Sequence, residues 1–283
     1  MGVTDCHVHI NPIDQMRPEA RAIFGAAARA DIAPYIADPR KFLDYLDASG
    51  VDRAVLMNYV APDVVGYTDA ANDFVSEYAA HDPARLIPVG GLLPTHRDPG
   101  ARVHELVERL GIRGIKVHPS HQLVAPNGYV DGSAPGLREI YRECEALRVP
   151  VIIHTGTSVF PKARNRFAHP MLVEDVAIDF PELTLVLAHG GRPLWMDEAV
   201  FLVRRFPNVY LELSSIPPSR LLQYFPRLEE LAPKALFGSD WPGPGVADIG
   251  DNLRAFQTLP LSDAARERIL VTNPETVFPR GTP

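Results

Sequence analysis

The alternation of short apolar segments with segments of helical spacing, repeated along the whole chain, most strongly constrains the fold. Several of the apolar runs are apolar on both faces before they end in a polar residue, which is typical of a parallel sheet that helices cover. The eight runs of strand length are VTDCHVHI, DRAVLMNY, LIPVGGLLP, RGIKVHP, VPVIIHTG, LTLVLAHGG, NVYLELSS and KALFGSDWP.

The segments between these runs have the spacing of amphipathic helices. Val103, Leu106, Val107 and Leu110, for example, place their side chains on one stripe of a helix. Alternating strands and helices form a parallel sheet with right-handed connections. Eight strands fit a closed (β/α)8 barrel, the TIM barrel, better than an open doubly wound sheet. Barrels of this length are routinely single domains, so we expect one α/β barrel domain over residues 1–283.

Two connections are longer than a barrel needs. Residues 11–38 separate the first strand from a helix expected to begin near Pro39, and residues 119–136 follow the fourth strand. Both come after the carboxyl ends of strands, on the face where barrel enzymes build their active sites. We expect these extended loops to cover a substrate, although unselected surface insertions fit the same pattern.

Composition limits the function classes. The chain has 46% hydrophobic and 22% charged residues, which is typical of a soluble globular protein, and its net charge of −7 argues against nucleic acid or an anionic membrane as partner. No run approaches the roughly 20 apolar residues of a membrane-spanning helix, and no signal-like segment precedes the first strand. Cys6 and Cys144 form no C-x-x-C pair. These features predict a cytoplasmic protein.

Polar side chains stand at the carboxyl ends of several predicted strands. The first strand carries His7 and His9, which share a face because alternate strand residues point the same way. Later strands end in His154, His189 and Asp240. In a closed barrel these ends surround one mouth, so the histidines and the carboxylate would meet there. Any one such histidine alone is more often a core residue, but the set suits a catalytic metal site with an open coordination position.

The motifs DCHVHI, IIHTG, LAHGG and LFGSDWP, in this order, resemble those of the amidohydrolase superfamily. The resemblance is to its amidohydrolase family 2 branch, which contains the aminocarboxymuconate semialdehyde decarboxylase-like enzymes, and it covers nearly the whole chain. It implies that His7, His9, His154 and Asp240 hold one divalent metal ion, most often zinc, with manganese or another divalent metal as alternatives. It also implies that His189 contacts the substrate or the metal, and it is compatible with a homodimer.

These parts predict the chemistry. A bound zinc ion lowers the pKa of a water molecule to about 7 and so supplies a nucleophile at neutral pH. Asp240 would accept the proton of this water and pass it to the leaving group, and His189 would polarise a carbonyl group. In members of the family that decarboxylate, the same metal and carboxylate bind the acid and deliver a proton to carbon.

Further polar residues near the strand ends complete the candidate site. Lys116 ends the fourth strand, where binuclear amidohydrolases carry a carboxylated lysine that bridges two metals. The branch resembled here is usually mononuclear, so a second metal is not expected, and a buried lysine paired with Glu212 is the alternative. The loop residue His121 is expected to be exposed. Arginine suits an acidic substrate because it pairs bidentately with carboxylates, whereas a tryptophan can line the pocket or pack the barrel rim. The candidates for substrate binding are His118, Arg164, Arg192 and Trp241.

Three hypotheses for function follow. The first is a metal-dependent hydrolase of a small, acidic amide, lactone or ester. The second is a nonoxidative decarboxylase of an aromatic or muconate-type acid, and the third is a metal-binding barrel that has lost catalysis. The segments GIKVHPSHQ and HTGTS depart from the decarboxylase pattern and favour hydrolysis. Every expected ligand position is filled, which argues against the third hypothesis.

Overall fold

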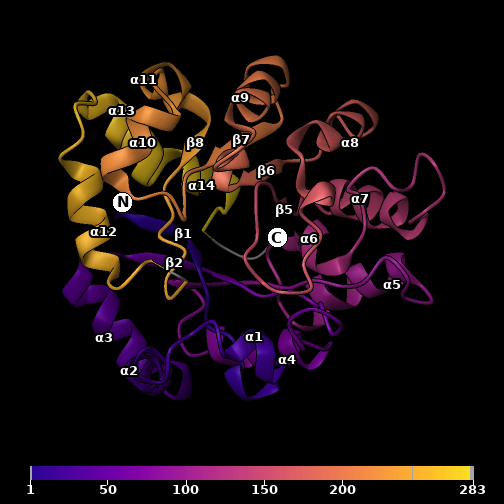
Figure 1. The fold of residues 1–283 in the computed structure, drawn as a ribbon, viewed down its shortest axis with the longest axis horizontal. Helices are drawn as coiled ribbons and strands as arrows, with labels where there is room; N and C mark the ends of the chain where they lie inside the picture. Colours follow the sequence, from indigo (N-terminus) through magenta and orange to yellow (C-terminus); the bar gives the residue numbers. More distant parts are fainter. Residues whose placement is uncertain (1, 244, 281–283) are drawn as a thin grey trace.

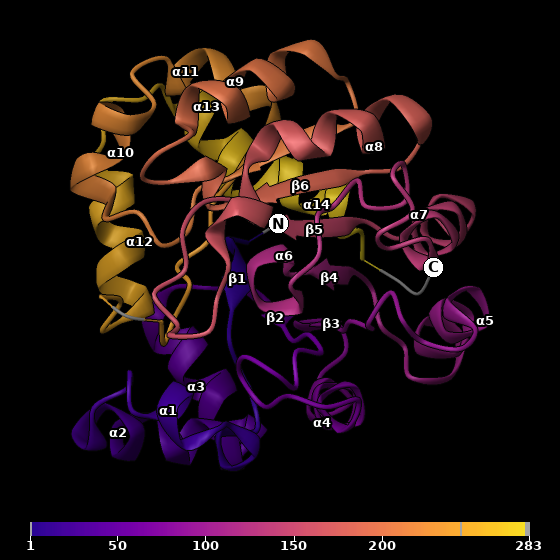
Figure 2. The same ribbon diagram turned by 45° about the vertical axis from the view of Figure 1, so that its right-hand side comes forward.

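In the described part of the chain, eight parallel strands form the centre of the molecule and helices surround them (Figure 1, Figure 2). The computed structural model describes residues 2–243 and 245–280, with all side chains among them except those of residues 26–30. Each strand lies inside one of the segments predicted from sequence and is shorter than that segment. The strands are β1 (Thr4–Val8), β2 (Arg53–Met57), β3 (Leu86–Val89), β4 (Ile115–Val117), β5 (Val151–His154), β6 (Leu185–Ala188), β7 (Val209–Glu212) and β8 (Ala235–Leu236).

Two sheets make up the ring of strands. One has the order β1-β2-β3 and the other the order β4-β5-β6-β7-β8, and all neighbouring strands are parallel. Backbone hydrogen bonds join the two sheets at both seams. The N–H of Lys116 donates to the carbonyl of Gly90 at 2.7 Å beside β3, and the N–H of Cys6 donates to the carbonyl of Phe237 at 2.9 Å after β8. The strands therefore follow one another around the ring in chain order.

Helices on the outside of the ring connect consecutive strands. The helices before β5 are α3 (Pro39–Ser49), α4 (Ala70–Ala79), α5 (Pro99–His104), the π-helical turn η2 (Glu105–Arg109) and α7 (Gly136–Ala146). Those between β5 and β8 are α8 (Glu174–Asp179), α9 (Met196–Arg205), α10 (Pro218–Tyr224), α11 (Leu228–Leu231) and η6 (Ala232–Lys234). The chain ends with α12 (Ile249–Gln257), α13 (Asp263–Glu267), the π-helical turn η7 (Arg268–Thr272) and α14 (Asn273–Val277). Among the described residues, none of the helices combines the length and the apolar character that crossing a membrane requires.

Helix α7 illustrates how the sequence pattern determines the packing. Its residues Leu137, Ile140, Tyr141 and Cys144 are three or four positions apart, so they lie on one face of the helix, and all four are buried. The thiol of Cys144 is unpaired, as is that of Cys6. Core packing is therefore the role of Cys144.

The long connections contain short helices rather than extended loops. Proline at the start of a helix costs no hydrogen bond, and several of these helices begin with it. Residues 11–38 hold η1 (Ile13–Gln15), α1 (Pro18–Arg21) and α2 (Ala26–Ala37), and residues 119–136 hold α6 (Pro119–Gln122). Further turns are η3 (Asn165–Ala168) and η4 (Pro170–Val173) after β5, and η5 (His189–Gly191) after β6. All of them follow the carboxyl ends of strands, as expected for segments that cover a site.

A separate apolar cluster fills the inside of the ring. It takes in strand residues and the carboxyl-terminal segment but no residue of the surrounding helices α3 to α13, and its members include Val55, Met57, Ile87, Val89, Ile152, Val186 and Leu236. Val277 and Phe278 close this cluster at one end. Arg53, the first residue of β2, holds the closing segment, because its Nη2 donates to the carbonyl of Phe278 at 2.6 Å and its Nη1 pairs with Glu275 at 2.8 Å.

We expect Arg53→Ala to lower the free energy of unfolding by about 3 kcal/mol, because it leaves the buried carbonyl of Phe278 and the half-buried carboxylate of Glu275 without their partner. Arg280→Ala is the matched control, since Arg280 pairs with Asp52 and Glu275 near the surface. Its loss should stay below about 1 kcal/mol. Urea denaturation of the two variants measures both values, and equal losses would contradict a closing role for Arg53.

Candidate active site

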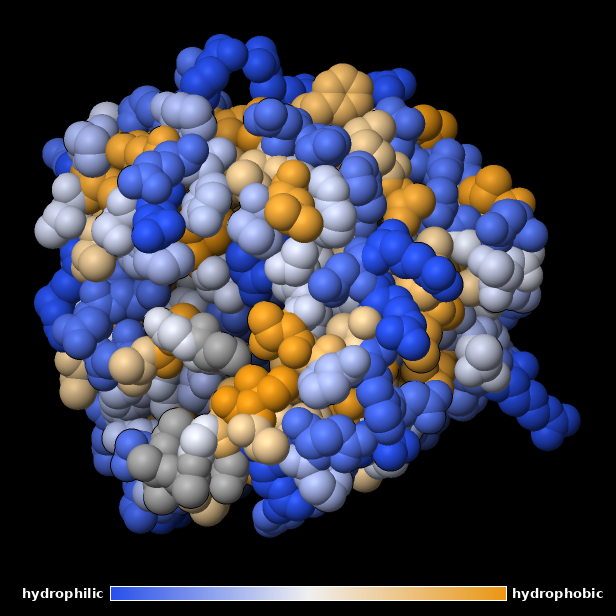
Figure 3. Space-filling view, in the orientation of Figure 1, coloured by the Kyte–Doolittle hydropathy of each residue, from blue (hydrophilic) through white to orange (hydrophobic). Residues whose placement is uncertain are grey.

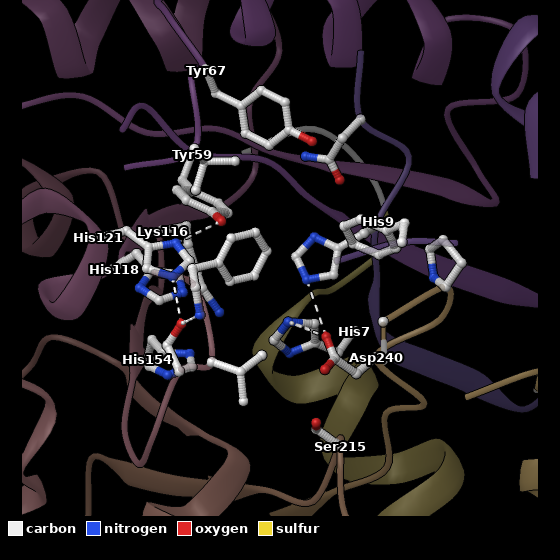
Figure 4. Close-up of a pocket in the computed structure, with 18 of the residues that line it drawn as sticks. His7, His9, Tyr59, Tyr67, Lys116, His118, His121, His154, Ser215 and Asp240 are labelled. Carbon is white, nitrogen blue, oxygen red and sulfur yellow. Dashed lines mark hydrogen bonds and ion pairs between the residues drawn. The ribbon is translucent and has the colours of Figure 1, made fainter. Parts of the chain in front are cut away.

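A pocket of about 290 Å³ opens beside the carboxyl ends of the strands. In Figure 4, His7, His9 and Asp240 lie on one side in this view, and Lys116, His118, His121 and His154 lie on the other. Apolar and aromatic side chains from the connections complete the wall, among them Met16, Ile36, Tyr59, Tyr67 and Phe160. On the face of the molecule shown in Figure 3, hydrophobic residues gather near the centre and hydrophilic residues surround them.

His7, His9 and Asp240 converge on one point. Nε2 of His9 lies 3.1 Å and Nε2 of His7 lies 3.6 Å from Oδ1 of Asp240. The Nδ1 atom of His9 lies 2.9 Å from the carbonyl of Met57. A carbonyl only accepts hydrogen bonds, so Nδ1 of His9 carries a proton, and a ring with this proton alone has its lone pair on Nε2. Nδ1 of His7 likewise faces an acceptor, Oε2 of Glu212 at 2.9 Å, so its lone pair is also on Nε2. Lone pairs of both rings thus face the carboxylate of Asp240, which is an arrangement that a cation stabilises.

The electrostatics of the site suit a metal ion. Burial lowers the pKa of His7, His154 and His189 well below its usual range, so these rings are neutral at neutral pH. Burial alone would raise the pKa of Asp240, but the close approach of the His9 and His7 rings and the nearby guanidinium of Arg192 lower it further, so this carboxylate is ionised. Neutral imidazoles and an ionised carboxylate are the ligands that zinc and manganese take in catalytic sites.

His154 and His189 lie beside the convergent group. The ring of His189 is 4.8 Å from that of His7 and 4.7 Å from that of His154. Nε2 of His154 is buried without a hydrogen-bond partner, as is Nε2 of His7. Such orphaned nitrogens fit a site that a bound ion completes. Among the described residues, the groups whose ligand atoms lie within 4.8 Å of one another are His7, His9, Asp240 and His7, His189, Glu212, so His154 lies next to these groups rather than within them.

The backbone at two strand ends turns sharply to aim these side chains. His189 has a φ of 66° and Asp240 a φ of 69°, both in the left-handed region that side chains disfavour. Each such residue costs about 1–3 kcal/mol, and such residues concentrate at functional sites. The N–H of Asp240 is held by the carbonyl of His7 at 2.8 Å, so the turn after β8 is fixed to β1.

The ring of His189 presents its Nε2 atom with a lone pair. Its Nδ1 lies 2.9 Å from the hydroxyl and 3.3 Å from the carbonyl of Ser214, and the carbonyl requires that Nδ1 be the donor. A neutral ring of this tautomer cannot donate from Nε2. The predicted polarisation of a carbonyl by His189 therefore requires that the ring first gain a proton.

Lys116 is buried in the pocket wall without a hydrogen-bond partner for its Nζ. The ion pair with Glu212 that the sequence offered as an alternative does not form, because Glu212 accepts from His7 and Ser214 instead. Burial lowers the pKa of Lys116, against the effect of the carboxylates of Glu212 and Asp240. The amine thus faces the pocket as an unpaired donor.

Of the predicted substrate-binding residues, His118 and Arg192 line the pocket. The ring of His118 stacks on His154 with centroids 3.9 Å apart. Arg192 donates to the carbonyl of Thr157 at 2.7 Å and to the hydroxyl of Ser215 at 2.6 Å. Its Nε is buried and has no partner.

The structure does not bring Arg164 and Trp241 to the pocket. Arg164 is exposed and is not among the lining residues. Trp241 is buried in an aromatic group, with its ring centroid 5.9 Å from that of Phe42 and 5.4 Å from that of Tyr45. It therefore packs the barrel rim, which was the alternative for this residue, because the chain turns after Asp240 and directs the next side chain outward.

The expectation that His121 is exposed is wrong. His121 is buried, stacks on His118 at 3.6 Å, and bonds to Tyr59 at 3.0 Å and Ser158 at 2.7 Å. The signal was present in the sequence, because the short helix after Pro119 brings His118 and His121 to the same side. Tyr59 and Ser158 carried no comparable signal, since both lie in loops whose course the sequence pattern does not specify.

Similar solved structures share the fold over almost the entire chain. An uncharacterized TIM-barrel protein from Bordetella bronchiseptica has a TM-score of 0.77 at 24% identity, covering 98% of both chains. A 5-carboxyvanillate decarboxylase from Novosphingobium aromaticivorans, complexed with manganese and 4-hydroxy-3-methoxy-5-nitrobenzoic acid, has a TM-score of 0.65 at 18% identity, covering 98% of this chain and 95% of that one. The phosphotriesterase homology protein from Escherichia coli, complexed with phosphate, has a TM-score of 0.61 at 13% identity, covering 98% of both chains. These matches confirm the predicted TIM-barrel fold.

Sequence comparison identifies the family. None of the curated proteins with which the chain was compared is similar to it. The model of the family described as "Amidohydrolase" matches residues 4–280, which is nearly the whole chain. The resemblance carried by the strand-end motifs is thereby confirmed, and the chain belongs to the amidohydrolase family.

Proposed function

We propose that residues 1–283 form one metal-dependent hydrolase domain that acts on a small amide, lactone or ester bearing a carboxylate. The observation that carries the proposal is the convergence of lone pairs from His7 and His9 on the ionised Asp240. His154, with its orphaned Nε2, completes the proposed ligand set. A divalent ion held there, zinc first and manganese second, would lower the pKa of a water molecule for attack on the substrate.

Two residues of the chain, Asp240 and His189, are proposed to transfer protons. Asp240 is ionised and lies at the convergence point, so it is suited to accept the proton of the attacking water and return it to the leaving group. His189 is neutral with a free Nε2, so it is suited to bind the metal or to take up a proton. Once protonated, it can donate to a carbonyl oxygen as negative charge develops there.

The unpaired cationic donors of the pocket support an acidic substrate. Nε of Arg192 and Nζ of Lys116 are buried without partners, and a buried donor without a partner costs about 1–3 kcal/mol. A substrate carboxylate would satisfy both atoms. His118, whose ring lines the same pocket, is the further proposed contact to the substrate.

A decarboxylase of an aromatic acid is the second candidate, and the aromatic part of the pocket wall favours it. Tyr59, Tyr67 and Phe160 line the pocket and would pack against a ring. The similar structure from Novosphingobium aromaticivorans is itself a decarboxylase with a benzoic acid bound. In this reaction the bond to the carboxyl group breaks, carbon dioxide leaves, and a proton replaces it on carbon.

The proposed setting of the enzyme is the cytoplasm, with a small molecule as its partner. The thiols of Cys6 and Cys144 are unpaired, which agrees with a reducing compartment. The net charge of −7 agrees with a partner other than nucleic acid.

Elemental analysis of protein purified without chelators tests the metal site. We expect about one zinc or manganese ion per chain, lost in His7→Ala and retained in the matched control His81→Ala, whose imidazole is exposed. Two ions per chain would instead indicate a carboxylated Lys116 that bridges them. If the parent binds no metal even after reloading, the proposed mechanism is wrong.

Asp240→Asn keeps the shape of the side chain but removes the proton acceptor, so turnover should fall by about 10²- to 10⁴-fold. The exposed Asp197→Asn is the control and should keep its rate. Acid release and carbon dioxide release, measured in parallel on a panel of carboxylates, identify the reaction. Carbon dioxide as the product would replace the hydrolase with the decarboxylase, and full turnover by Asp240→Asn would refute the proton transfer.

Arg192→Met should raise KM for a carboxylate substrate by about 10- to 100-fold, because a hydrogen bond to a charged group contributes about 1.5–3 kcal/mol. The KM for the corresponding methyl ester should change much less. Arg164→Met provides the comparison, since Arg164 is exposed and away from the pocket. An equal change in KM for the acid in both variants would contradict the assignment of Arg192.

A further inference from the structure

Glu212, the last residue of β7, lies completely buried behind the site and receives several hydrogen bonds. Its Oε2 lies 2.9 Å from Nδ1 of His7 and accepts from the Ser214 hydroxyl at 2.8 Å and from the His189 N–H at 3.3 Å. Its Oε1 accepts from the Ser214 N–H at 2.7 Å. One carboxylate thus touches both histidines that flank the proposed catalytic centre.

The contact with His7 determines which nitrogen of that ring is free. A carboxylate only accepts, so Nδ1 of His7 is the donor and Nε2 carries the lone pair. Nε2 of His7 is buried and has no partner in the protein. The lone pair therefore points to the place where it is needed for a metal.

The contact of Glu212 with Ser214 favours the same tautomer in His189, with the proton on Nδ1. A hydroxyl has a single proton, and Ser214 donates it to Glu212. The oxygen of Ser214 must then accept from Nδ1 of His189, at 2.9 Å. Nε2 of His189 is left with a lone pair, as it is in His7.

The end of β8 leaves room for this carboxylate. A Cβ atom at Gly238 would lie 2.3 Å from Oε1 of Glu212 and 2.8 Å from Cβ of His7. Any side chain at position 238 would push the carboxylate and the imidazole apart. The glycine of the LFGSDWP motif thus provides the space that Glu212 occupies.

We propose that Glu212 is a positioning residue that fixes the tautomers of two histidines, His7 directly and His189 through Ser214. Both rings are thereby held with an unprotonated Nε2. The effect on metal affinity rests on the proposed function, whereas the tautomers are properties of the chain without metal. Carboxylates that orient metal-binding histidines in this way typically raise the metal affinity by about 10- to 100-fold.

Glutamine cannot replace Glu212 without a mismatch. Its single oxygen can face the Ser214 N–H or Nδ1 of His7, but not both, and its amide group then points at the remaining donor. The backbone N–H groups of Ser214 and His189 face Oε1 and Oε2, respectively, and cannot change their role as donors. Either orientation of the amide therefore opposes one of them, and neither orientation holds the proton of His7 on Nδ1 as firmly as the carboxylate does, since the ring can move this proton to Nε2. We therefore expect Glu212→Gln to convert His7 to the tautomer that cannot bind a metal through Nε2.

The test combines nitrogen NMR of ¹⁵N-histidine-labelled, metal-free protein with chelator competition for zinc. The parent should show Nδ1–H tautomers at His7 and His189, assigned with single histidine variants. Glu212→Gln should shift His7 to the Nε2–H tautomer and weaken zinc binding by about 10- to 100-fold. Ser214→Ala is the control. It removes the 2.9 Å contact with the hydroxyl and leaves the longer 3.3 Å contact with the backbone carbonyl, so a second tautomer should appear at His189 in part, while His7 and the zinc affinity should stay as in the parent.

Unchanged tautomers and unchanged zinc affinity in Glu212→Gln would overturn the inference. If that variant does not fold, the parent decides alone, because an Nε2–H tautomer at His7 in the metal-free parent would contradict the contact with Glu212 on which the inference rests. A parent that shows the expected tautomers but neither binds metal nor turns over any substrate would refute the proposed function and leave this inference standing.

Discussion

The site depends on the seam at which the ring of strands closes. Backbone hydrogen bonds tie β1 to the segment after β8, from Cys6 to Phe237 at 2.9 Å, from Asp240 to His7 at 2.8 Å and from His9 to Trp241 at 2.7 Å. Residues more than 200 positions apart in the chain therefore share one register. Because these bonds involve the backbone of His7, His9 and Asp240, closing the barrel brings together three of the four proposed ligands.

The free-energy cost of burying polar groups without hydrogen bonds explains why the site is suited to a bound ion or substrate. Most buried polar atoms near the mouth are satisfied by the chain, as Oδ1 of Asp5 is by the N–H groups of His7 and Ser239. Of the seven buried side-chain atoms without a hydrogen-bond partner among the described residues, four belong to residues that line the pocket: Nε2 of His7, Nε2 of His154, Nζ of Lys116 and Nε of Arg192. The other three are Oδ2 of Asp5, Nε of Arg53 and Nε of Arg102. At about 1–3 kcal/mol each, such atoms persist where a bound ion or substrate compensates them. The lone pairs of the two histidines can bind a cation, and the donors of Lys116 and Arg192 can bind an anion. This combination fits a metal ion together with a carboxylate substrate.

The sequence predicted the strands, the helices and the polar residues at the strand ends. It did not predict the placement of side chains that depends on the course of the loops. The strands and the helix at Pro39 were found because burial imposes a period on the sequence. The packing of Trp241 at the rim depends on the turn after β8, which no period specifies, whereas the burial of His121 was missed although its three-residue spacing from His118 was visible. The role of Glu212 was missed for a related reason: its position on the strand was visible, but its partner was assigned by charge to Lys116, whereas the structure gives it to His7 and Ser214.

The same pocket suits hydrolysis and decarboxylation because both reactions need similar groups in the active site. Each needs an acid held against cationic donors, a carboxylate that moves one proton, and a wall for the rest of the substrate. Lys116 and Arg192 offer the donors, Asp240 the carboxylate, and Tyr59 and Phe160 the wall. The reactions differ in whether a water molecule must fit between Asp240 and the reacting carbon. With the proposed residue roles, both reactions use the same catalytic residues, so we propose that the approach of the substrate to the ligand group decides between them.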